Sequence, residues 1–199
     1  ELAESIAETA SKLVVGNAIN ADTQCGPLIR NREVDRVEEW VLEAVNAGAE
    51  IICGGKRLSS SCYAPTILLN PPENCRVSRD EIFGPVLSVL RPKTYEEAVN
   101  LVMTHEYGNG TAIFTRDGDA AREFANNVNV GMVGVNVPIP VPVAYHSFGG
   151  WKASMFGDHS IHGMEGVRFY TKLKTVTARW PSGIKDGAVF NFHSGSDNK

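Results

Sequence analysis

The sequence predicts an α/β protein with a parallel sheet, because short apolar runs alternate with stretches of helical periodicity along most of its length. The alternation is most regular between residues 86 and 137, where the connections are short. A chain of 199 residues is long enough for one domain with a buried core, or for one domain and an arm. With 43% hydrophobic and 21% charged residues, the composition is that of a globular protein.

Charge and cysteine usage exclude several classes of protein. The net charge of −4 comes without a basic patch, which argues against a nucleic-acid partner. No apolar run has the length of a bilayer span, and no signal peptide opens the chain, so no membrane partner is expected. Cys25, Cys53, Cys62 and Cys75 show no CxxC spacing, which is typical of reduced thiols in the cytoplasm.

Two amphipathic helices are expected in the first fifty residues. Residues 1–14 have apolar side chains at helical spacing, with acidic residues on the other face (Leu2, Ile6, Ala10 and Leu13). A loop around Gly26-Pro27 precedes the second helix, which Gly48 ends and whose apolar stripe is Val34, Val37, Val41, Ala44 and Val45. Strands are expected at 50–53, closed by two glycines, and at 64–69, closed by two prolines.

The second half predicts a β-α-β-α-β unit. The strands are 86–90, 111–114 and 130–137. The first helix starts with the capping box Thr94 to Glu97 and buries Tyr95, Ala98, Val99 and Val102. The second covers 117–128, with Ala121, Phe124 and Ala125 inward. Such units place parallel strands in one sheet through right-handed crossovers. No G-x-G-x-x-G follows any of the strands, so a complete dinucleotide-binding domain is not expected.

The last quarter is less regular. Alternate prolines hold residues 138–142 extended, either as a pocket wall or as a structural brace. A short helix is expected at 162–169, followed by one long strand at 170–180. An uncovered strand of that length favours pairing with another subunit, although its lysines could instead protect the edge of a monomer. The tail 181–199 is expected to be loose.

The stretch 79–86 is the strongest candidate for a binding site. In an extended segment Glu81 and Phe83 point to the same side, so they could present a carboxylate and a ring to one ligand. The competing interpretation is a solvated loop carboxylate and a core phenylalanine. A metal site from Asp158, His159 and His162 is not expected, because glycines flank the pair and no third strong ligand is evident. No local signature of a Cys-His hydrolase occurs either.

Four motifs in order give the chain a resemblance to a known family. They lie at 81–86 (EIFGPV), 109–114 (NGTAIF), 148–154 (FGGxKxS) and 170–177 (YTxxKTVT), and they resemble the C-terminal part of the aldehyde dehydrogenase superfamily from residue 1 to about 181. The match corresponds to less than half of a family chain. Since Glu1 opens inside a helical pattern without a methionine, we expect a piece of a longer polypeptide.

The resemblance implies three segments: residues 1–169 as part of the catalytic domain, 170–181 as an oligomerisation strand, and 182–199 as a tail. A narrower resemblance, carried by 135–142, 156–158 and 163–166, is to the CoA-acylating methylmalonate-semialdehyde dehydrogenase branch, an enzyme of valine catabolism.

That branch implies a specific chemistry. A cysteine thiolate attacks a semialdehyde, NAD takes a hydride, and the acyl group passes to CoA with decarboxylation, giving propionyl-CoA or acetyl-CoA. Glu81 matches the carboxylate that binds the nicotinamide-ribose hydroxyls, and Phe83 the ring beside the nicotinamide. Phe148 matches an aromatic residue of the aldehyde pocket, residues 137–146 the loop at its entrance, and 170–180 the arm that extends a neighbour's sheet in a homo-oligomer.

The departures from the family pattern concern catalysis. The nucleophilic cysteine, the oxyanion-hole asparagine and the dinucleotide fingerprint lie upstream in the family, and none of the four cysteines sits in the nucleophile's motif. The chain is therefore expected to contain no catalytic residue and to be inactive alone. Two alternatives stay open: a CoA-independent aldehyde dehydrogenase, and a non-catalytic module that only binds or oligomerises.

Overall fold

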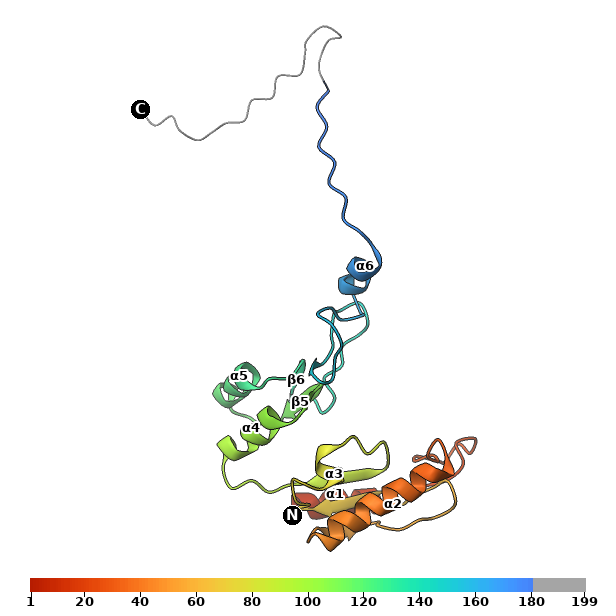
Figure 1. Ribbon diagram of the computed structural model, residues 1–199. Coiled ribbons are helices and arrows are strands. Elements are labelled where there is room, and N and C mark those ends of the chain that lie inside the picture. The colour runs from red at the N-terminus through yellow and green to blue at the C-terminus, as the bar shows by residue number, and fades with distance from the viewer. Residues whose placement is uncertain (181–199) are drawn as a thin grey trace.

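The chain folds around a three-stranded sheet and two two-stranded pairs in the computed structural model, which describes residues 1–180 (Figure 1). The larger sheet has the order β1-β2-β3, with β1 at Glu50–Cys53, β2 at Thr66–Leu69 and β3 at Val86–Val89. β1 pairs antiparallel with β2, and β2 pairs parallel with β3 from Thr66↔Val86 to Leu69↔Val89. All three strands were expected from the sequence, and the α/β class is confirmed.

Two helices bury the central strand from opposite sides. α2 (Asn31–Asn46) packs its valines against Leu68, which is completely buried. α1 (Leu2–Ser11) lies over β1 and β2, and its Ile6 and Ala10 face the same cavity as Ile67. Because successive side chains of a strand point to opposite faces, a strand covered on both faces is apolar throughout. That is why all four residues of β2 are buried.

The expected apolar stripe of α2 is confirmed, and that of α1 is confirmed only in part. Four of the five predicted α2 residues are fully buried, and Gly48 follows the helix with a left-handed φ of 109°. In α1, by contrast, Ala3 and Ala7 are the buried residues, while Leu2 and Leu13 are exposed. The helix ends at Ser11, before Leu13, so the predicted position of Leu13 on a helical face is wrong.

The second parallel pair lies above the first sheet in Figure 1. β5 (Gly110–Ile113) and β6 (Met132–Val135) pair in parallel across α5 (Gly118–Asn127), as the crossover predicts. α4 (Tyr95–Thr104) and α5 share one cluster with this pair, in which Phe124, Val128 and Val130 are buried. Ala125, expected inward, is exposed.

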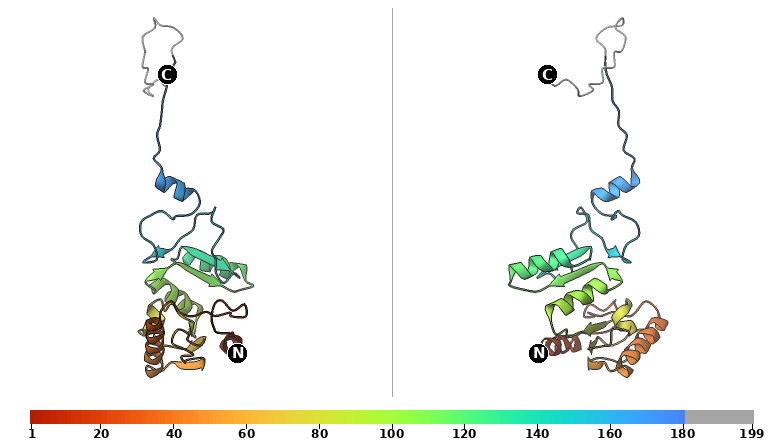
Figure 2. Two further views of the ribbon diagram at one scale, coloured as in Figure 1. Left: turned by 90° about the vertical axis from the view of Figure 1, so that its right-hand side faces the viewer. Right: turned by 60° about the vertical axis from the view of Figure 1, so that its left-hand side comes forward.

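The expectation that β3 joins β5 and β6 in one sheet is wrong for the described residues. β3 pairs with β2, and α4 lies between the two sheets in Figures 1 and 2. Its predicted inward residues Ala98, Val99 and Val102 are only half-buried, and Tyr95 is exposed. An alternation of strands and helices predicts crossovers, but it does not identify which strand each one joins.

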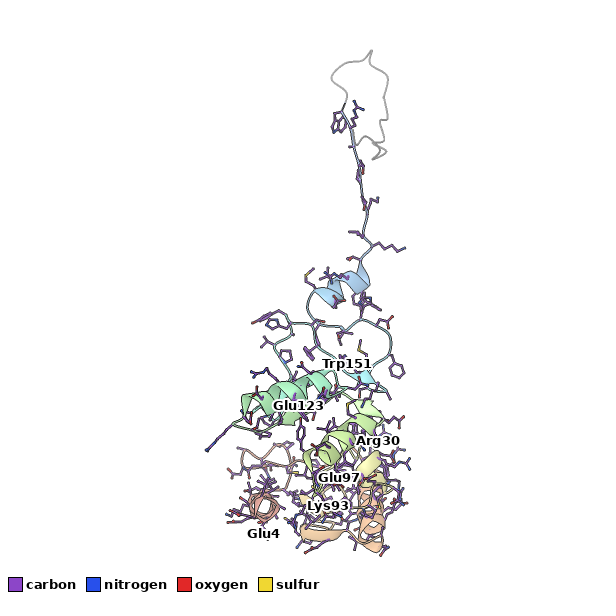
Figure 3. All side chains as sticks on the ribbon, turned by 90° about the vertical axis from the view of Figure 1, so that its left-hand side faces the viewer. Glu4, Arg30, Lys93, Glu97, Glu123 and Trp151 are labelled. Atoms are coloured by element: carbon purple, nitrogen blue, oxygen red, sulfur yellow. The ribbon has the colours of Figure 1, made fainter. Side chains whose placement is uncertain are left out.

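Side-chain caps fix the starts of both crossover helices. The Thr94 hydroxyl accepts a hydrogen bond from the Glu97 backbone N–H at 3.2 Å, which confirms the capping interaction. The Glu97 carboxylate accepts from the backbone N–H of Lys93 at 2.7 Å, one residue earlier than in the standard capping box, and Figure 3 labels both residues at this end of α4. Asp117 caps α5 by accepting from the N–H groups of Asp119 and Ala120.

A short antiparallel pair ties the C-terminal loops to this body. β4 (Tyr107–Gly108) pairs with β7 (Trp151–Lys152), and Figure 3 labels Trp151 on β7. The backbones approach closely beside it, since a Cβ on Gly131 would lie 1.9 Å from the Gly149 carbonyl oxygen. The two-glycine motif at 149–150 therefore permits a close backbone contact.

The remaining described residues lead away from the body. α3 (Arg76–Arg79) packs on α2, and α6 (Met164–Tyr170) corresponds to the helix expected at 162–169. After α6, residues 171–180 are exposed and extend away from the other elements in both views of Figure 2. They form no strand in the part of the chain that the structure describes, so the strand expected at 170–180 is not present there. The predicted tail 182–199 lies outside the described residues. Within residues 1–180, no helix has the length and apolar character needed to cross a membrane.

Candidate nucleotide-facing clefts

The segment 81–85 leaves α3 and turns sharply before β3. Phe83 has a φ of 43° and is therefore left-handed, which is uncommon for a residue with a bulky side chain. Gly84 lies so close to α2 that a Cβ there would come within 2.7 Å of Val37 Cγ2. The extended geometry assumed for Glu81 and Phe83 is therefore wrong. The two side chains nevertheless line one cavity.

Glu81 also lines a second and more polar space, which we call the Glu81 cleft. Its volume is about 670 Å³. Besides Asp80 and Glu81, its walls come from the end of α4, the β4–β5 segment, the residue Val130 before β6 and the loop after β7. The lining residues are Leu101, Val102, His105, Tyr107, Asn109, Gly110, Thr111, Val130, Ala153 and Ser154. Residues of three of the four sequence motifs meet here although they are far apart in the chain.

The Glu81 cleft has the chemical character of a site for a neutral or cationic polar ligand. Asp80 and Glu81 provide acceptors, and hydroxyl, amide and imidazole groups from Tyr107, Asn109 and His105 can donate. No lysine or arginine is among the described residues that line it. His105 Nδ1 accepts from the Tyr107 backbone N–H at 3.1 Å, so in the neutral ring the proton is on Nε2.

Lys152 fixes one wall of the Glu81 cleft. Its ammonium donates to the carbonyls of Val102, Met103 and His105 at 3.0–3.1 Å, and so closes the C-terminal end of α4. Lys152 has a φ of 53°, again in the left-handed region. Two residues later, the Ser154 hydroxyl accepts from the Gly108 backbone N–H at 3.1 Å. The FGGxKxS motif thus holds the residues that line the cleft.

The cavity shared by Glu81 and Phe83, which we call the Phe83 cavity, opens on the other side of the segment. It has a volume of about 840 Å³ and is largely apolar. Phe83 is 76% exposed at its edge. Glu33, Arg36 and Trp40 of α2 form the opposite wall. The hydrogen bond from Arg36 holds the pKa of Glu33 below its ordinary value.

Sequence reasoning missed the residues of α2 and α4 that face these spaces. Arg36 and Trp40 are four residues apart on α2 and therefore share a face, a spacing visible in the sequence. His105 follows α4 directly, and nothing in its local sequence distinguishes it from a solvated histidine.

Phe148 lies apart from Glu81 and Phe83. It is half-buried beside another cavity, of about 470 Å³, and stacks on the ring of His162 with 4.3 Å between centroids and 15° between planes. None of the cavities described here has both Phe148 and Glu81 in its walls.

The two histidines considered as metal ligands point to different partners. His159 Nδ1 lies 2.7 Å from a Glu165 carboxylate oxygen, whereas His162 stacks on Phe148. Hydrogen bonds from His159 and then Arg168 hold the pKa of Glu165 below its ordinary value. In the part of the chain that the structure describes, no group of three or more acidic, histidine or cysteine side chains could hold a metal ion.

All four cysteines are free thiols. Cys75 is buried, because α3 begins directly after it and packs on α2. Burial raises the pKa of Cys25 and of Cys75 above the ordinary value for a thiol. A raised pKa reduces the thiolate fraction, so neither environment activates a nucleophile.

Comparison with known proteins identifies the family. The sequence matches the aldehyde dehydrogenase family over residues 1–176. The chain belongs to the aldehyde dehydrogenase family. This member is 49% identical over 173 residues to the malonate-semialdehyde dehydrogenase of Pseudomonas aeruginosa, an alignment that covers 82% of the chain and 35% of the relative. It is 40% identical over 180 residues to the malonate-semialdehyde dehydrogenase of Bacillus cereus, an alignment that covers 88% of this chain and 37% of the relative. The chain thus spans little more than a third of the length of these curated relatives.

Solved structures of the family agree with this assignment. A methylmalonate-semialdehyde dehydrogenase from Oceanimonas doudoroffii superposes with a TM-score of 0.86 at 45% identity, covering 92% of this chain and 38% of that one. A structure from Sinorhizobium meliloti is described as a methylmalonate-semialdehyde dehydrogenase complexed with NAD. It superposes with a TM-score of 0.87 at 44% identity, covering 93% of this chain and 39% of that one. These findings confirm the resemblance seen in the four motifs.

Proposed function

We propose that this chain supplies the coenzyme-facing part of an NAD-dependent, CoA-acylating dehydrogenase of malonate or methylmalonate semialdehyde. The Glu81 cleft carries the proposal: its walls combine two carboxylates with hydroxyl and amide groups and include no described cationic side chain. Vicinal hydroxyls of a ribose can donate to such carboxylates, and the positively charged nicotinamide ring of NAD is compatible with them. The relatives named above support the choice of substrate.

The residues present fit NAD in two respects. Glu81 faces both spaces and can accept hydrogen bonds from the ribose, and the exposed ring of Phe83 offers a flat apolar surface beside it. When bound, NAD would accept the hydride released in the oxidation. Phe148, half-buried in its own cavity, would contact the aldehyde.

The proposal assigns the remaining chemistry to groups outside this chain. The cysteine nucleophile is not among the four cysteines here, in agreement with the raised pKa of Cys25 and Cys75. CoA would take the acyl group after decarboxylation, giving acetyl-CoA or propionyl-CoA. The extended residues 171–180 would pair with a second copy, because exposed backbone groups of an extended segment are satisfied by another strand. The proposed location of such an enzyme is the cytoplasm.

The direct test is an NADH-formation assay with methylmalonate semialdehyde, NAD and CoA. We expect no turnover by the 199-residue chain and CoA-dependent turnover by a chain extended at its N-terminus to include a cysteine motif. Turnover by the extended chain without CoA would favour a CoA-independent aldehyde dehydrogenase. Turnover by the 199-residue chain would show that one of its own cysteines is the nucleophile.

A second test addresses Glu81. In Glu81→Gln of the N-terminally extended chain one charge-assisted acceptor is lost, so the dissociation constant for NADH, followed by fluorescence, should rise roughly 10-fold to 100-fold. In the extended enzyme the same change should slow hydride transfer in a single turnover. Glu123→Gln is the matched control, because it makes the same carboxylate-to-amide change at an exposed residue of α5. Equal NADH affinity in Glu81→Gln and wild type would refute the assignment of Glu81.

A further inference from the structure

Arg36 of α2 contacts the backbone of the segment that carries Glu81 and Phe83. Its Nη2 donates to the Ile82 carbonyl oxygen at 2.5 Å, across 46 positions of the chain. Its Nε donates to a Glu33 carboxylate oxygen at 2.9 Å, and its guanidinium lies 4.6 Å from the centroid of the Trp40 ring. Three neighbours therefore fix the side chain, which is about a quarter exposed.

The position of the Ile82 carbonyl determines where its two neighbours point. Glu81 and Phe83 flank Ile82, and the left-handed φ of Phe83 makes the turn intrinsically unfavourable. A bulky residue remains in that region only where its surroundings hold it there. Val37, one residue after Arg36, packs against the same segment at Gly84, where an added Cβ would lie 2.7 Å from Val37 Cγ2. α2 thus supports the turn at two successive points.

We propose that Arg36 is a positioning residue, which holds the Ile82 carbonyl and thereby orients Glu81 toward the Glu81 cleft and Phe83 toward the Phe83 cavity. The proposal rests on the proposed function, in which these two side chains bind NAD. Trp40 and Glu33 orient the guanidinium: the ring supports its flat face, and the carboxylate fixes one edge. The Nη2 group of the same side chain is then directed to the Ile82 carbonyl.

Trp40 is also contacted by a second arginine, whose role differs. The Arg76 guanidinium lies 5.3 Å from the same ring, but its hydrogen bonds go to Glu39 and Glu43 of α2. Arg76 therefore joins α3 to α2. The distinction predicts that substitutions of Arg36 act locally on the turn.

The test is backbone hydrogen exchange of the 199-residue chain, compared between wild type and variants. In Arg36→Met, the amides of residues 82–84 and 86, which we call the 82–86 amides because Pro85 has none, should exchange about tenfold faster, the effect of losing one partly exposed hydrogen bond from a charged donor. The amide of the fully buried Leu68 in β2 should exchange at the wild-type rate. Arg36→Lys keeps the charge but not the planar group and should give an intermediate rate.

Arg32→Met is the matched control, because Arg32 lies one turn earlier on α2 and pairs with the same Glu33 carboxylate at 3.3 Å. It should leave exchange at 82–86 unchanged. The proposal is overturned if Arg36→Met leaves that exchange unchanged, or accelerates β2 as much as the turn. It is also overturned if Arg32→Met has the same local effect.

The outcome can be separated from that of the proposed function. In a chain extended at its N-terminus to include the dinucleotide fingerprint, NADH should slow exchange at 82–86 in wild type and less so in Arg36→Met. If NADH protects neither chain, the assignment of NAD fails, while the ligand-free comparison still decides whether Arg36 holds the turn. If NADH protects both equally although Glu81→Gln abolishes the protection, Arg36 does not position the binding groups.

Discussion

Replacing Lys152 with methionine tests how the FGGxKxS motif supports the Glu81 cleft. The ammonium donates to three carbonyls at the end of α4, and methionine keeps much of the aliphatic stem without the charge. The left-handed φ of residue 152 is unfavourable for either side chain, so backbone strain largely cancels in the comparison. The difference in stability therefore reports the ammonium.

The magnitude follows from the exposure of the three contacts. The bonds to Val102 and His105 are partly buried, and the bond to Met103 is exposed, where water can replace the donor. A hydrogen bond from a charged donor contributes about 1.5–3 kcal/mol, and a cation at a helix C-terminus about 0.3–1 kcal/mol. We therefore expect a loss of about 3 kcal/mol, which lowers the Tm by roughly 6–12 °C for a chain of this size.

Thermal unfolding followed by circular dichroism measures this shift. Lys174→Met, on the exposed extended segment, serves as the control and should leave the Tm unchanged. Lys152→Arg should retain part of the stability, since its guanidinium can still donate to the helix end. A decrease of less than about 2 °C in Lys152→Met, well below the range derived from the charged hydrogen bond, would refute the reasoning.

Three further predictions follow from contacts described above. Gly131→Ala should destabilise the protein by about 1–3 kcal/mol in urea unfolding, because its Cβ would collide with the Gly149 carbonyl; wild-type stability would contradict the close approach. Hydrogen bonds hold the pKa values of Glu43 and Glu165 below the ordinary 4.5, so their stabilisation should be complete above pH 4.5 and disappear as the pH falls through the lowered values; urea midpoints that stay constant in acid would contradict this. Deleting residues 170–180 should leave a smaller assembly by light scattering, and an unchanged mass would refute the proposed pairing of this segment with a second copy.

Local signals in the sequence predicted local structure well. The valine stripe of α2 and the Gly48 stop follow from periodicity and from the preference of glycine for left-handed backbone. The Thr94 cap likewise follows from a hydroxyl three residues before Glu97. In each case the interacting residues lie within a few positions of one another, so the pattern contains the contact.

Features that depend on distant partners were not predictable in the same way. β3 lies in a different sheet from β5 and β6 because it pairs with β2, a strand that precedes the Glu81 segment in the sequence. The exposure of Ala125 and the burial of Cys75 depend on which faces α5 and α3 turn to their neighbours. Periodicity identifies an apolar face but not the area that a neighbour covers.

The candidate site was predictable in part. Glu81, Asn109 and Ser154 belong to motifs visible in the sequence, and the fold brings them to one cleft. The left-handed turn at Phe83 was not predictable, since phenylalanine rarely adopts it. Arg36 was missed because it recognises a backbone carbonyl, and every residue type presents the same carbonyl.

The two separate clusters of buried residues have a consequence for how the molecule opens. Among residues 1–180, the cluster between α2 and the β1-β2-β3 sheet contains eight buried residues, whereas the one beneath α5 contains three. Cooperative units with little buried apolar area unfold locally at lower free energy than the whole protein. The β5–β6 body should therefore open first, exposing to proteases the NGTAIF strand and the loops that follow it while the Glu81 turn remains folded on α2.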